Sequence, residues 1–214
     1  MKKVLVFLLI IMFISLLIFV GCGKQTVQLF NGKDFTGWEF ELETDTVTAE
    51  DVWSVKDGVI HCEGIPTGYM HTVQAYSNYI LTLEWRWVEH KSNSGVLLHV
   101  QSPDQVWPLC IECQLQAGNA GDMVLIGQGS ITVNDSLYNN TGRFLVIPKQ
   151  NDSNEKPVGE WNSYKIVCKG NAITCYVNGM MQNNGQNASL SSGKIGLQSE
   201  GGPIEFRNIQ LEKL

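Results

Sequence analysis

Six polar side chains that could carry out acid–base chemistry fall within residues 79–117. They comprise two carboxylates, a guanidinium, an imidazole and two amides: Glu84, Arg86, His99, Glu112, Gln114 and Gln116. Such a set can supply a general base, a proton donor, and a cation or hydrogen-bond donors for a developing negative charge. We therefore treat this segment as the candidate site and ask which elements would position it.

Three runs of alternating apolar and polar residues carry these side chains: residues 79–87, 94–100 and 110–116. Alternation is typical of β-strands, in which successive side chains point to opposite faces. In the second run the apolar set is Val96, Leu98 and Val100. Leu97 and His99 then fall on the opposite face. If the three runs are neighbours in one sheet, their polar residues share a single face, and we predict that this face holds the site.

Short runs of the same kind fill most of the remaining chain, separated by turn signals such as Asp57-Gly58 and Asn178-Gly179. No segment after the leader shows a helical period. This pattern predicts an all-β protein, a two-sheet antiparallel sandwich or jelly roll, in one domain without repeats. The polar residues 134–157 form the longest predicted loop, and we expect this loop to border a cleft.

The N-terminal stretch has Lys2 and Lys3, then a long apolar run, then Gly21-Cys22. This is the pattern of a secretion signal, and its cysteine resembles the lipobox of bacterial lipoproteins. We predict a signal peptide over residues 1–22 with a lipidated Cys22, then one domain over residues 23–214. The alternative is an uncleaved anchor, because about 17 apolar residues is near the lower limit for spanning a bilayer. Either way we expect an exported, membrane-tethered protein, periplasmic or on the outer membrane or cell surface.

The charge balance argues against a nucleic-acid partner. The formal charge is −6, and loss of the leader leaves 13 basic against 21 acidic residues, or −8. No basic stretch follows the leader, so neutral or weakly charged ligands fit better. No Asp/His cluster has the sequence spacing of metal ligands, and we predict that neither a metal nor another cofactor is required.

Five cysteines follow Cys22: Cys62, Cys110, Cys113, Cys168 and Cys175. An odd number leaves at least one thiol unpaired unless it bridges to another chain. Cys110 and Cys113 have CxxC spacing, but in a strand they point to opposite faces, which argues against a redox or zinc motif. Cys168 and Cys175 flank an expected hairpin, where they could form a disulfide if the register allows or remain buried free thiols.

Several stretches along the chain together resemble one family. They include Leu29-Phe30-Asn31-Gly32-Lys33-Asp34, Glu84-Trp85-Arg86, Asn93-Ser94-Gly95, Glu112-Cys113-Gln114 and Glu205-Phe206-Arg207-Asn208-Ile209. From about Gln28 to Leu214 the sequence is similar to the 3-keto-disaccharide (3-keto-glycoside) hydrolase domain family, which is frequent in carbohydrate-degrading gut Bacteroidetes. The resemblance implies a concanavalin A-like jelly roll of the lectin/glucanase type, with carbohydrate handled on a concave sheet face. His99 is a departure, since the family commonly has Arg there.

The resemblance also implies cleavage of glycosides whose sugar is oxidised at C3. A 3-keto group acidifies the hydrogen at C2, so a base can remove it, the C1 oxygen leaves in a 1,2-elimination, and water then adds. Under this hypothesis Glu112 or Glu84 is the base. His99 is the acid or a second base, and Arg86 holds the enolate. Substrate hydroxyl groups would be bound by amide side chains: Asn93, Gln114, Gln116 and Gln198.

Two other functions stay open from the sequence. If the three runs form a meander, Glu84 and Glu112 lie about 9.6 Å apart at a strand spacing of ~4.8 Å. That separation disfavours a retaining glycosidase, which needs ~5–5.5 Å, and leaves an inverting one, which needs ~6.5–9.5 Å, possible. The protein could also be a non-catalytic carbohydrate-binding module, because the fold serves lectins too. Trp107 and Tyr138, in predicted loops, are candidates for stacking on sugar rings.

Each candidate residue also has a purely structural interpretation. Glu84 and Arg86 could pair on a solvated sheet, and His99 could be a hydrogen-bonded structural histidine. Glu112 is harder to explain in this way. An unpaired acid between two strand cysteines requires solvent or a ligand.

Overall fold

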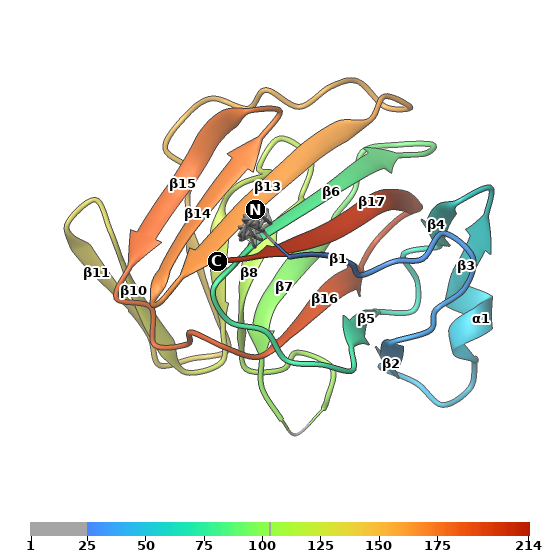
Figure 1. The fold of residues 1–214 in the computed structure, drawn as a ribbon, viewed down its shortest axis with the longest axis horizontal. Helices are drawn as coiled ribbons and strands as arrows, with labels where there is room; N and C mark the ends of the chain where they lie inside the picture. Colours follow the sequence, from blue (N-terminus) through green and yellow to red (C-terminus); the bar gives the residue numbers. More distant parts are fainter. Residues whose placement is uncertain (1–24, 103) are drawn as a thin grey trace, which may run out of the picture.

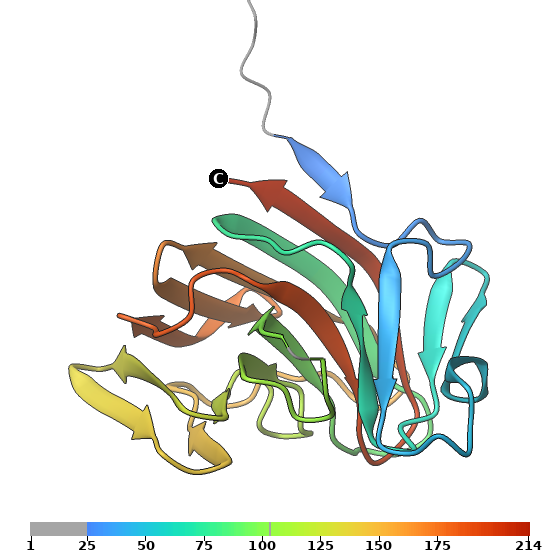
Figure 2. The ribbon, with the colours of Figure 1, turned by 90° about the horizontal axis from the view of Figure 1, so that it is seen from below.

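The computed structural model describes residues 25–102 and 104–214, which fold into two stacked antiparallel β-sheets (Figure 1, Figure 2). The predicted all-β, two-sheet jelly roll is therefore confirmed. The predicted signal peptide and Cys22 lie outside the described residues. Within the described ranges, we find no helix with the length and apolar character needed to cross a membrane.

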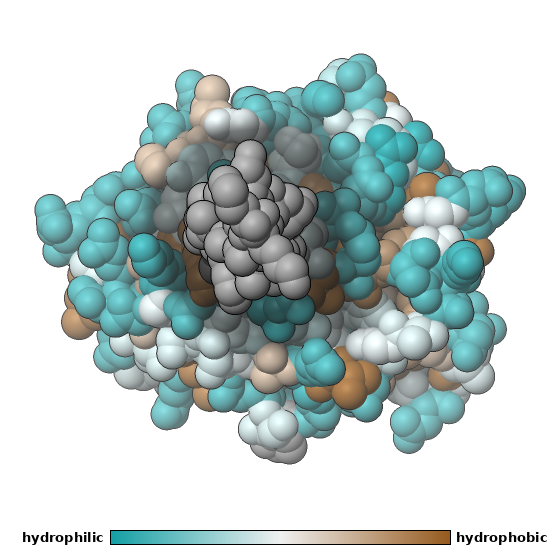
Figure 3. Space-filling model, in the orientation of Figure 1, coloured by the Kyte–Doolittle hydropathy of each residue, from teal (hydrophilic) through white to brown (hydrophobic). Residues whose placement is uncertain are grey.

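Sheet A contains ten strands and faces the viewer in Figure 1. In spatial order they are β11 (Ser136–Asn140), β10 (Gly129–Val133), β15 (Met180–Gln186), β14 (Ala172–Val177), β13 (Asn162–Lys169), β6 (Tyr79–Trp87), β17 (Ile204–Lys213), β4 (Val59–Cys62) and β3 (Trp53–Lys56), with β1 (Thr26–Gln28) beside β17. Where it is visible in Figure 3, the outer face of this sheet is largely hydrophilic. Sheet A therefore has the ordinary pattern of one buried and one solvated face.

Sheet B contains seven strands and lies behind sheet A in Figure 1. In spatial order they are β12 (Phe144–Ile147), β9 (Met123–Ile126), β8 (Cys110–Gln114), β7 (Gly95–Val100), β16 (Lys194–Ser199), β5 (Gly68–Thr72) and β2 (Trp38–Leu42). A short helix, α1 (Ala49–Val52), precedes β3.

The inner faces of both sheets form one hydrophobic core. In β6 every second residue is buried, so that Leu81, Leu83 and Trp85 face the core while the residues between them are partly exposed. Leu98 and Ile111 enter the same core from sheet B. Each fully buried side chain of this kind contributes ~1.5–3 kcal/mol through the hydrophobic effect.

Sheet B is also sheltered on its outer face. A second apolar cluster lies there: Tyr69, Leu97, Val100, Cys110, Val124 and Ile126, with Trp107 packed against it. Trp107 belongs to the segment after β7, which folds back over the sheet. The backbone N–H of Gln101 donates to the carbonyl of Leu109 (3.0 Å), and the hydroxyl of Tyr69 donates to the carbonyl of Gln105 (3.1 Å). Strands β5, β7, β8 and β9 are consequently buried on both sides.

The prediction that residues 79–87 neighbour the next two strands in one sheet is wrong. β6 pairs with β13 and β17 in sheet A, whereas β7 pairs with β8 and β16 in sheet B. Residues 88–94 thus carry the chain from one sheet to the other. Alternation specifies which side chains share a face of a strand, but it does not specify the sheet that the strand joins. Glu84 and Arg86 therefore lie on the outer face of sheet A, on the far side of the core from Glu112.

The predicted orientation of His99 is also wrong, because β7 contains a β-bulge. Against β16, Leu97 lies opposite Gly196 and Val100 opposite Lys194, so β7 has one extra residue, and His99 has a φ of 55°. After the bulge the faces exchange. The His99 ring points into the core against the ring of Tyr79 (centroids 5.9 Å apart), and its Nδ1 lies 3.2 Å from the carbonyl oxygen of Leu190.

Two further expectations are corrected. Residues 134–157 are not one long loop, because they contain β11 and β12. In the β13–β14 hairpin Cys168 lies opposite Ile173, and Cys175 lies opposite Ile166, so the two cysteines do not face each other. The five described cysteines are buried free thiols. The sulfur atom of Cys175 lies 2.6 Å from that of Cys113, which reaches it from sheet B.

His99 predicts a pH dependence of stability. Burial lowers the pKa of His99 from 6.5 to about 4, so between these values the unfolded chain binds a proton that the folded chain does not. The stabilisation is complete above pH 6.5 and is lost as the pH falls toward 4, by about 3 kcal/mol. We expect the free energy of unfolding, measured in denaturant, to fall more steeply over this window in the wild type than in H99Q. Parallel curves would contradict a buried neutral histidine.

Candidate active site

A small pocket of about 200 Å³ opens on the outer face of sheet B, around Glu112. We call it the Glu112 pocket, and it is lined by Asn93, Trp107, Glu112, Gln114, Val124, Phe144, Val146 and Glu200. One side is polar, with two acids and two amides, and the other is apolar and aromatic. Sites that bind small ligands commonly combine such an apolar wall with a few convergent polar groups.

The Glu112 carboxyl group occupies space that Gly95 leaves open. Gly95 lies directly opposite Gln114 on the neighbouring strand, and a Cβ at Gly95 would lie 2.1 Å from Oε1 of Glu112. The Glu112 side chain is 4% exposed, and its Oε1 has no hydrogen-bond partner among the described residues. Burial disfavours the charged form, and the nearby charge of Glu200 adds to this effect. Together they raise the pKa of Glu112 from 4.5 to about 8.

Glu200 is the second acid of the pocket. It follows β16, where Asn93 makes bridging backbone contacts with Glu200 and Gly201. Burial raises the pKa of Glu200 above its usual value, while a hydrogen bond from the Asn93 side chain acts in the opposite direction. Burial therefore raises the pKa of both acids, but only Glu200 has a hydrogen bond that lowers it. Pairs of acids whose environments affect their pKa values differently are typical of acid–base catalysis.

Gln114 lines the polar side of the pocket, and a further amide, Gln198, lies next to it. The oxygen of the Gln114 side chain accepts the backbone N–H groups of Leu115 and Gln116, each at 3.1 Å, which leaves its NH2 group free to donate to a ligand. Gln198 is 2% exposed on β16, and its Oε1 lacks a hydrogen-bond partner within the described part of the chain. Through the strand register Gln198 lies beside Gly95, next to the Glu112 carboxyl group.

The aromatic wall comes from two segments far apart in sequence. The rings of Trp107 and Phe144 meet edge to face, with centroids 5.2 Å apart. The guanidinium of Arg143 lies 5.6 Å and 5.1 Å from these two ring centroids. Phe144 is 45% exposed and Val146 is 52% exposed, so this wall offers apolar surface to a ligand. Trp107 lies in a loop and lines the pocket, and its role in sugar binding stays a prediction.

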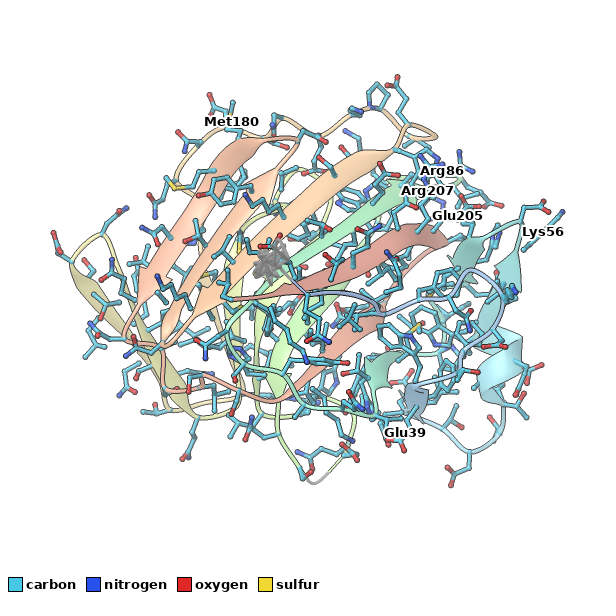
Figure 4. The ribbon with its side chains drawn as sticks, viewed as in Figure 1. Glu39, Lys56, Arg86, Met180, Glu205 and Arg207 are labelled. Atoms are coloured by element: carbon cyan, nitrogen blue, oxygen red, sulfur yellow. The ribbon has the colours of Figure 1, made fainter. Side chains whose placement is uncertain are left out.

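The other two predicted catalytic residues belong to an ion-pair network on sheet A. Glu84 Oε2 accepts hydrogen bonds from Arg207 Nε (2.6 Å) and Asn208 Nδ2 (3.0 Å). Arg86 pairs with Glu205, and Figure 4 shows Arg86, Arg207 and Glu205 together at one end of the sheet. A larger groove of about 680 Å³ runs past Glu84. Its acid is already paired, so the structural interpretation of Glu84 and Arg86 fits better than catalysis.

Three of the predicted binding residues do not line the Glu112 pocket: Gln198, which lies beside it, Gln116 and Tyr138. Gln116 is exposed in the turn after β8, where its side-chain oxygen accepts from Asn119 (2.8 Å). Tyr138 is part of β11, at the edge of sheet A, and packs against the core. Sequence reasoning missed Glu200 and Phe144. The signal for Glu200 was an acid at the end of an alternating run and before Gly201-Gly202, a position that often places a side chain at a site.

The fold is that of carbohydrate-active jelly rolls. A proposed glycosyl hydrolase from Parabacteroides distasonis superposes with a TM-score of 0.65 at 24% identity, over 88% of this chain and 94% of that one. A β-glucanase from Bacillus licheniformis superposes with a TM-score of 0.56 at 14% identity, over 90% of this chain and 98% of the enzyme. At these identities the likeness concerns the fold alone.

Residues 25–212 match the 3-keto-alpha-glucoside-1,2-lyase-like domain, and the chain belongs to this family. This confirms the resemblance seen in the sequence motifs. A 3-keto-disaccharide hydrolase from Bacteroides thetaiotaomicron is 27% identical over 167 residues, or 69% of this chain. The matched region is 54% of that relative, so the chain spans about half of the relative's length.

The shifted acid can be tested directly by titration. We expect the Glu112 carboxyl carbon, followed by 13C NMR, to titrate near pH 8, because burial raises its pKa to about 8. In E200Q the pKa should fall, since the charge of Glu200 is removed, but should stay above its ordinary value because burial remains. E205Q, on sheet A, is the control and should leave the pKa of Glu112 unchanged. A Glu112 midpoint near 4.5 in the wild type would rule out the described environment.

Proposed function

We propose that this protein cleaves glycosides of 3-keto sugars in the Glu112 pocket, by elimination across C1 and C2 followed by addition of water. The observation that carries the proposal is the pair of acids, the buried Glu112 and the half-buried Glu200, in a pocket with an aromatic wall. Membership of the 3-keto-alpha-glucoside-1,2-lyase-like family and the similarity to a 3-keto-disaccharide hydrolase support the substrate class.

The two acids take complementary roles in this proposal. The Glu200 carboxylate removes the proton at C2, and the C–H electrons form an enolate with the C3 carbonyl. The enolate then re-forms the ketone, the C1=C2 double bond forms, and the C1–O bond breaks. Glu112 gives its proton to the departing oxygen. Water addition reverses the order, since Glu112 takes a proton from the water that attacks C1, and Glu200 returns its proton to C2.

Amide groups donate the hydrogen bonds to the enolate that were first assigned to Arg86. Arg86 cannot donate them, because it lies on the opposite sheet. The free NH2 group of Gln114 and the buried amide of Gln198 are the donors we assign to the enolate oxygen and the sugar hydroxyl groups. The pocket measures about 200 Å³. Because pockets for drug-sized ligands measure roughly 300–1,000 Å³, this smaller pocket suits one sugar ring, stacked on the wall of Trp107 and Phe144.

The same pair of acids favours one alternative, an inverting glycosidase acting on unoxidised glycans. Glu112 would again protonate the leaving oxygen, while Glu200 would activate a water molecule. The two reactions differ at C2, because elimination breaks the C2–H bond and direct displacement leaves it intact. The solvent isotope therefore distinguishes them.

The test of the reaction class uses matched 3-keto and unoxidised glucosides of one aglycone, incubated with the protein in D2O. We expect the aglycone to be released from the 3-keto substrate and the resulting keto sugar to carry deuterium at C2. Release from the unoxidised glucoside without C2 deuterium would favour the inverting glycosidase. Binding of either sugar without any release would identify a carbohydrate-binding module.

Substitution of the acids separates their roles. We expect E112Q to lower aglycone release by about 10³-fold, the usual scale for loss of a general acid, while substrate C2–H exchange in D2O continues. E200Q should abolish both release and exchange, because the base is missing. E84Q is the matched control on sheet A and should retain activity. Loss of activity in E84Q together with full activity in E112Q would place the site on the other sheet.

We also propose that Cys22 anchors the protein in a bacterial membrane, on the periplasmic or cell-surface side. The support is the leader pattern that ends in Gly21-Cys22. In cells fed labelled palmitate, the wild type should become labelled and sediment with membranes, whereas C22A should remain unlabelled. Equal labelling of both proteins would reject this anchor.

A further inference from the structure

A second polar cluster lies on the outer face of sheet B, away from the Glu112 pocket. It joins Glu39 of β2, His71 of β5 and Asp104 of the segment after β7, whose ligand-type atoms all lie within 4.8 Å of one another. Glu39 lies opposite His71, and the row continues through Gly196 and Leu97 to Glu112. His71 and Glu112 are therefore three strands apart, roughly 14 Å at ~4.8 Å per strand. Figure 4 shows Glu39 at the edge of the molecule.

His71 is oriented as metal-binding histidines commonly are. Its side chain is fully buried, and its Nδ1 lies 3.2 Å from the carbonyl oxygen of Thr72. A carbonyl oxygen can only accept, so Nδ1 carries the proton and Nε2 presents its lone pair. Holding one ring nitrogen by a backbone carbonyl fixes the tautomer and orients the other nitrogen toward a metal.

The lone pair of His71 Nε2 faces the carboxylate of Asp104, and no hydrogen-bond donor lies between these two acceptors. Nε2 lies 3.9 Å from Asp104 Oδ1, too far for a hydrogen bond, and it has no hydrogen-bond partner among the residues described. Glu39 Oε2 lies 3.9 Å from the other ring nitrogen. A buried acceptor that faces a carboxylate is unfavourable unless a proton or a metal cation lies between the two groups.

A cation is already attracted to this position. The Lys194 ammonium lies 2.9 Å from Asp104 Oδ2 and 3.4 Å from Glu39 Oε2, and its side chain is only 17% exposed. The positive charge of Lys194 compensates one of the two negative charges. Among the described residues, its ammonium group donates no hydrogen bond to His71 Nε2. The cluster thus keeps one net negative charge and one free imidazole nitrogen.

We propose that Glu39, His71 and Asp104 bind a divalent transition-metal ion, in competition with the Lys194 ammonium. One imidazole and two carboxylates form a ligand set that suits Zn2+ or Mn2+, with water in the remaining positions. The ion would fasten the segment that carries Asp104 and Trp107 to β2 and β5. Its place is distinct from the acids of the proposed reaction, so binding and turnover can be measured separately.

Calorimetric titration of the purified protein with Zn2+ alone, and with Mn2+ alone, tests the site. We expect one saturable site per chain. D104N and H71Q should weaken binding at least tenfold, because each removes a ligand. K194M should tighten binding about tenfold, because the competing cation is removed. Tighter metal binding after removal of the positive side chain would show that Lys194 and the metal ion compete for the same carboxylates.

His61 provides the matched control, because its Nδ1 lies 2.9 Å from Glu205 Oε1 on sheet A, in another histidine–carboxylate pair. H61N should bind as the wild type does. If H71Q fails to fold, D104N and E39Q carry the test, since both side chains are partly exposed. Absence of saturable binding in both the wild type and K194M would overturn the proposal. The proposal would also be overturned if D104N and E39Q bound Zn2+ or Mn2+ with the affinity of the wild type.

Discussion

A buried carboxyl group without a partner is the constraint on which the site depends. Glu112 lies in the middle of sheet B, between β7 and β9, and its strand cannot turn the side chain to solvent without breaking both ladders. An ionised carboxylate there would be costly, so burial raises the pKa of Glu112 to about 8. Burial of this carboxyl group destabilises the fold, and it keeps Glu112 protonated at neutral pH, so that Glu112 can donate a proton.

The charged groups of sheet A show the opposite arrangement. Glu84 and Glu205 each meet an arginine, and the guanidinium groups of Arg86 and Arg207 lie 4.5 Å and 4.0 Å from the ring centroid of Trp161. These groups are partly solvated and paired, so each pair contributes about 0–1 kcal/mol to stability. The contrast between the paired acids Glu84 and Glu205 on sheet A and the unpaired Glu112 on sheet B distinguishes a structural surface from a chemical one.

One segment of chain links the two polar clusters of sheet B. Residues after β7 cross the outer face of the sheet, where Trp107 forms a wall of the Glu112 pocket and Asp104 reaches the ammonium of Lys194. The apolar cluster beneath them, which includes Leu97 and Val100, separates the clusters and excludes water from the middle of the face. The sheltered face of sheet B is therefore shaped as much by this segment as by its strands.

Alternating side chains and glycine-rich turns were sufficient to predict the strands, the all-β class and the face of its strand on which Glu112 lies, because these features depend on residues close together in sequence. The family resemblance was also present in short motifs. Only the tertiary structure decided that β6 joins sheet A, that a bulge turns His99 into the core, and that Glu200 meets Glu112. It also decided that Glu39, His71 and Asp104 meet at all. Sheet membership and bulges depend on which distant strands pair, and local alternation contains no information about that choice.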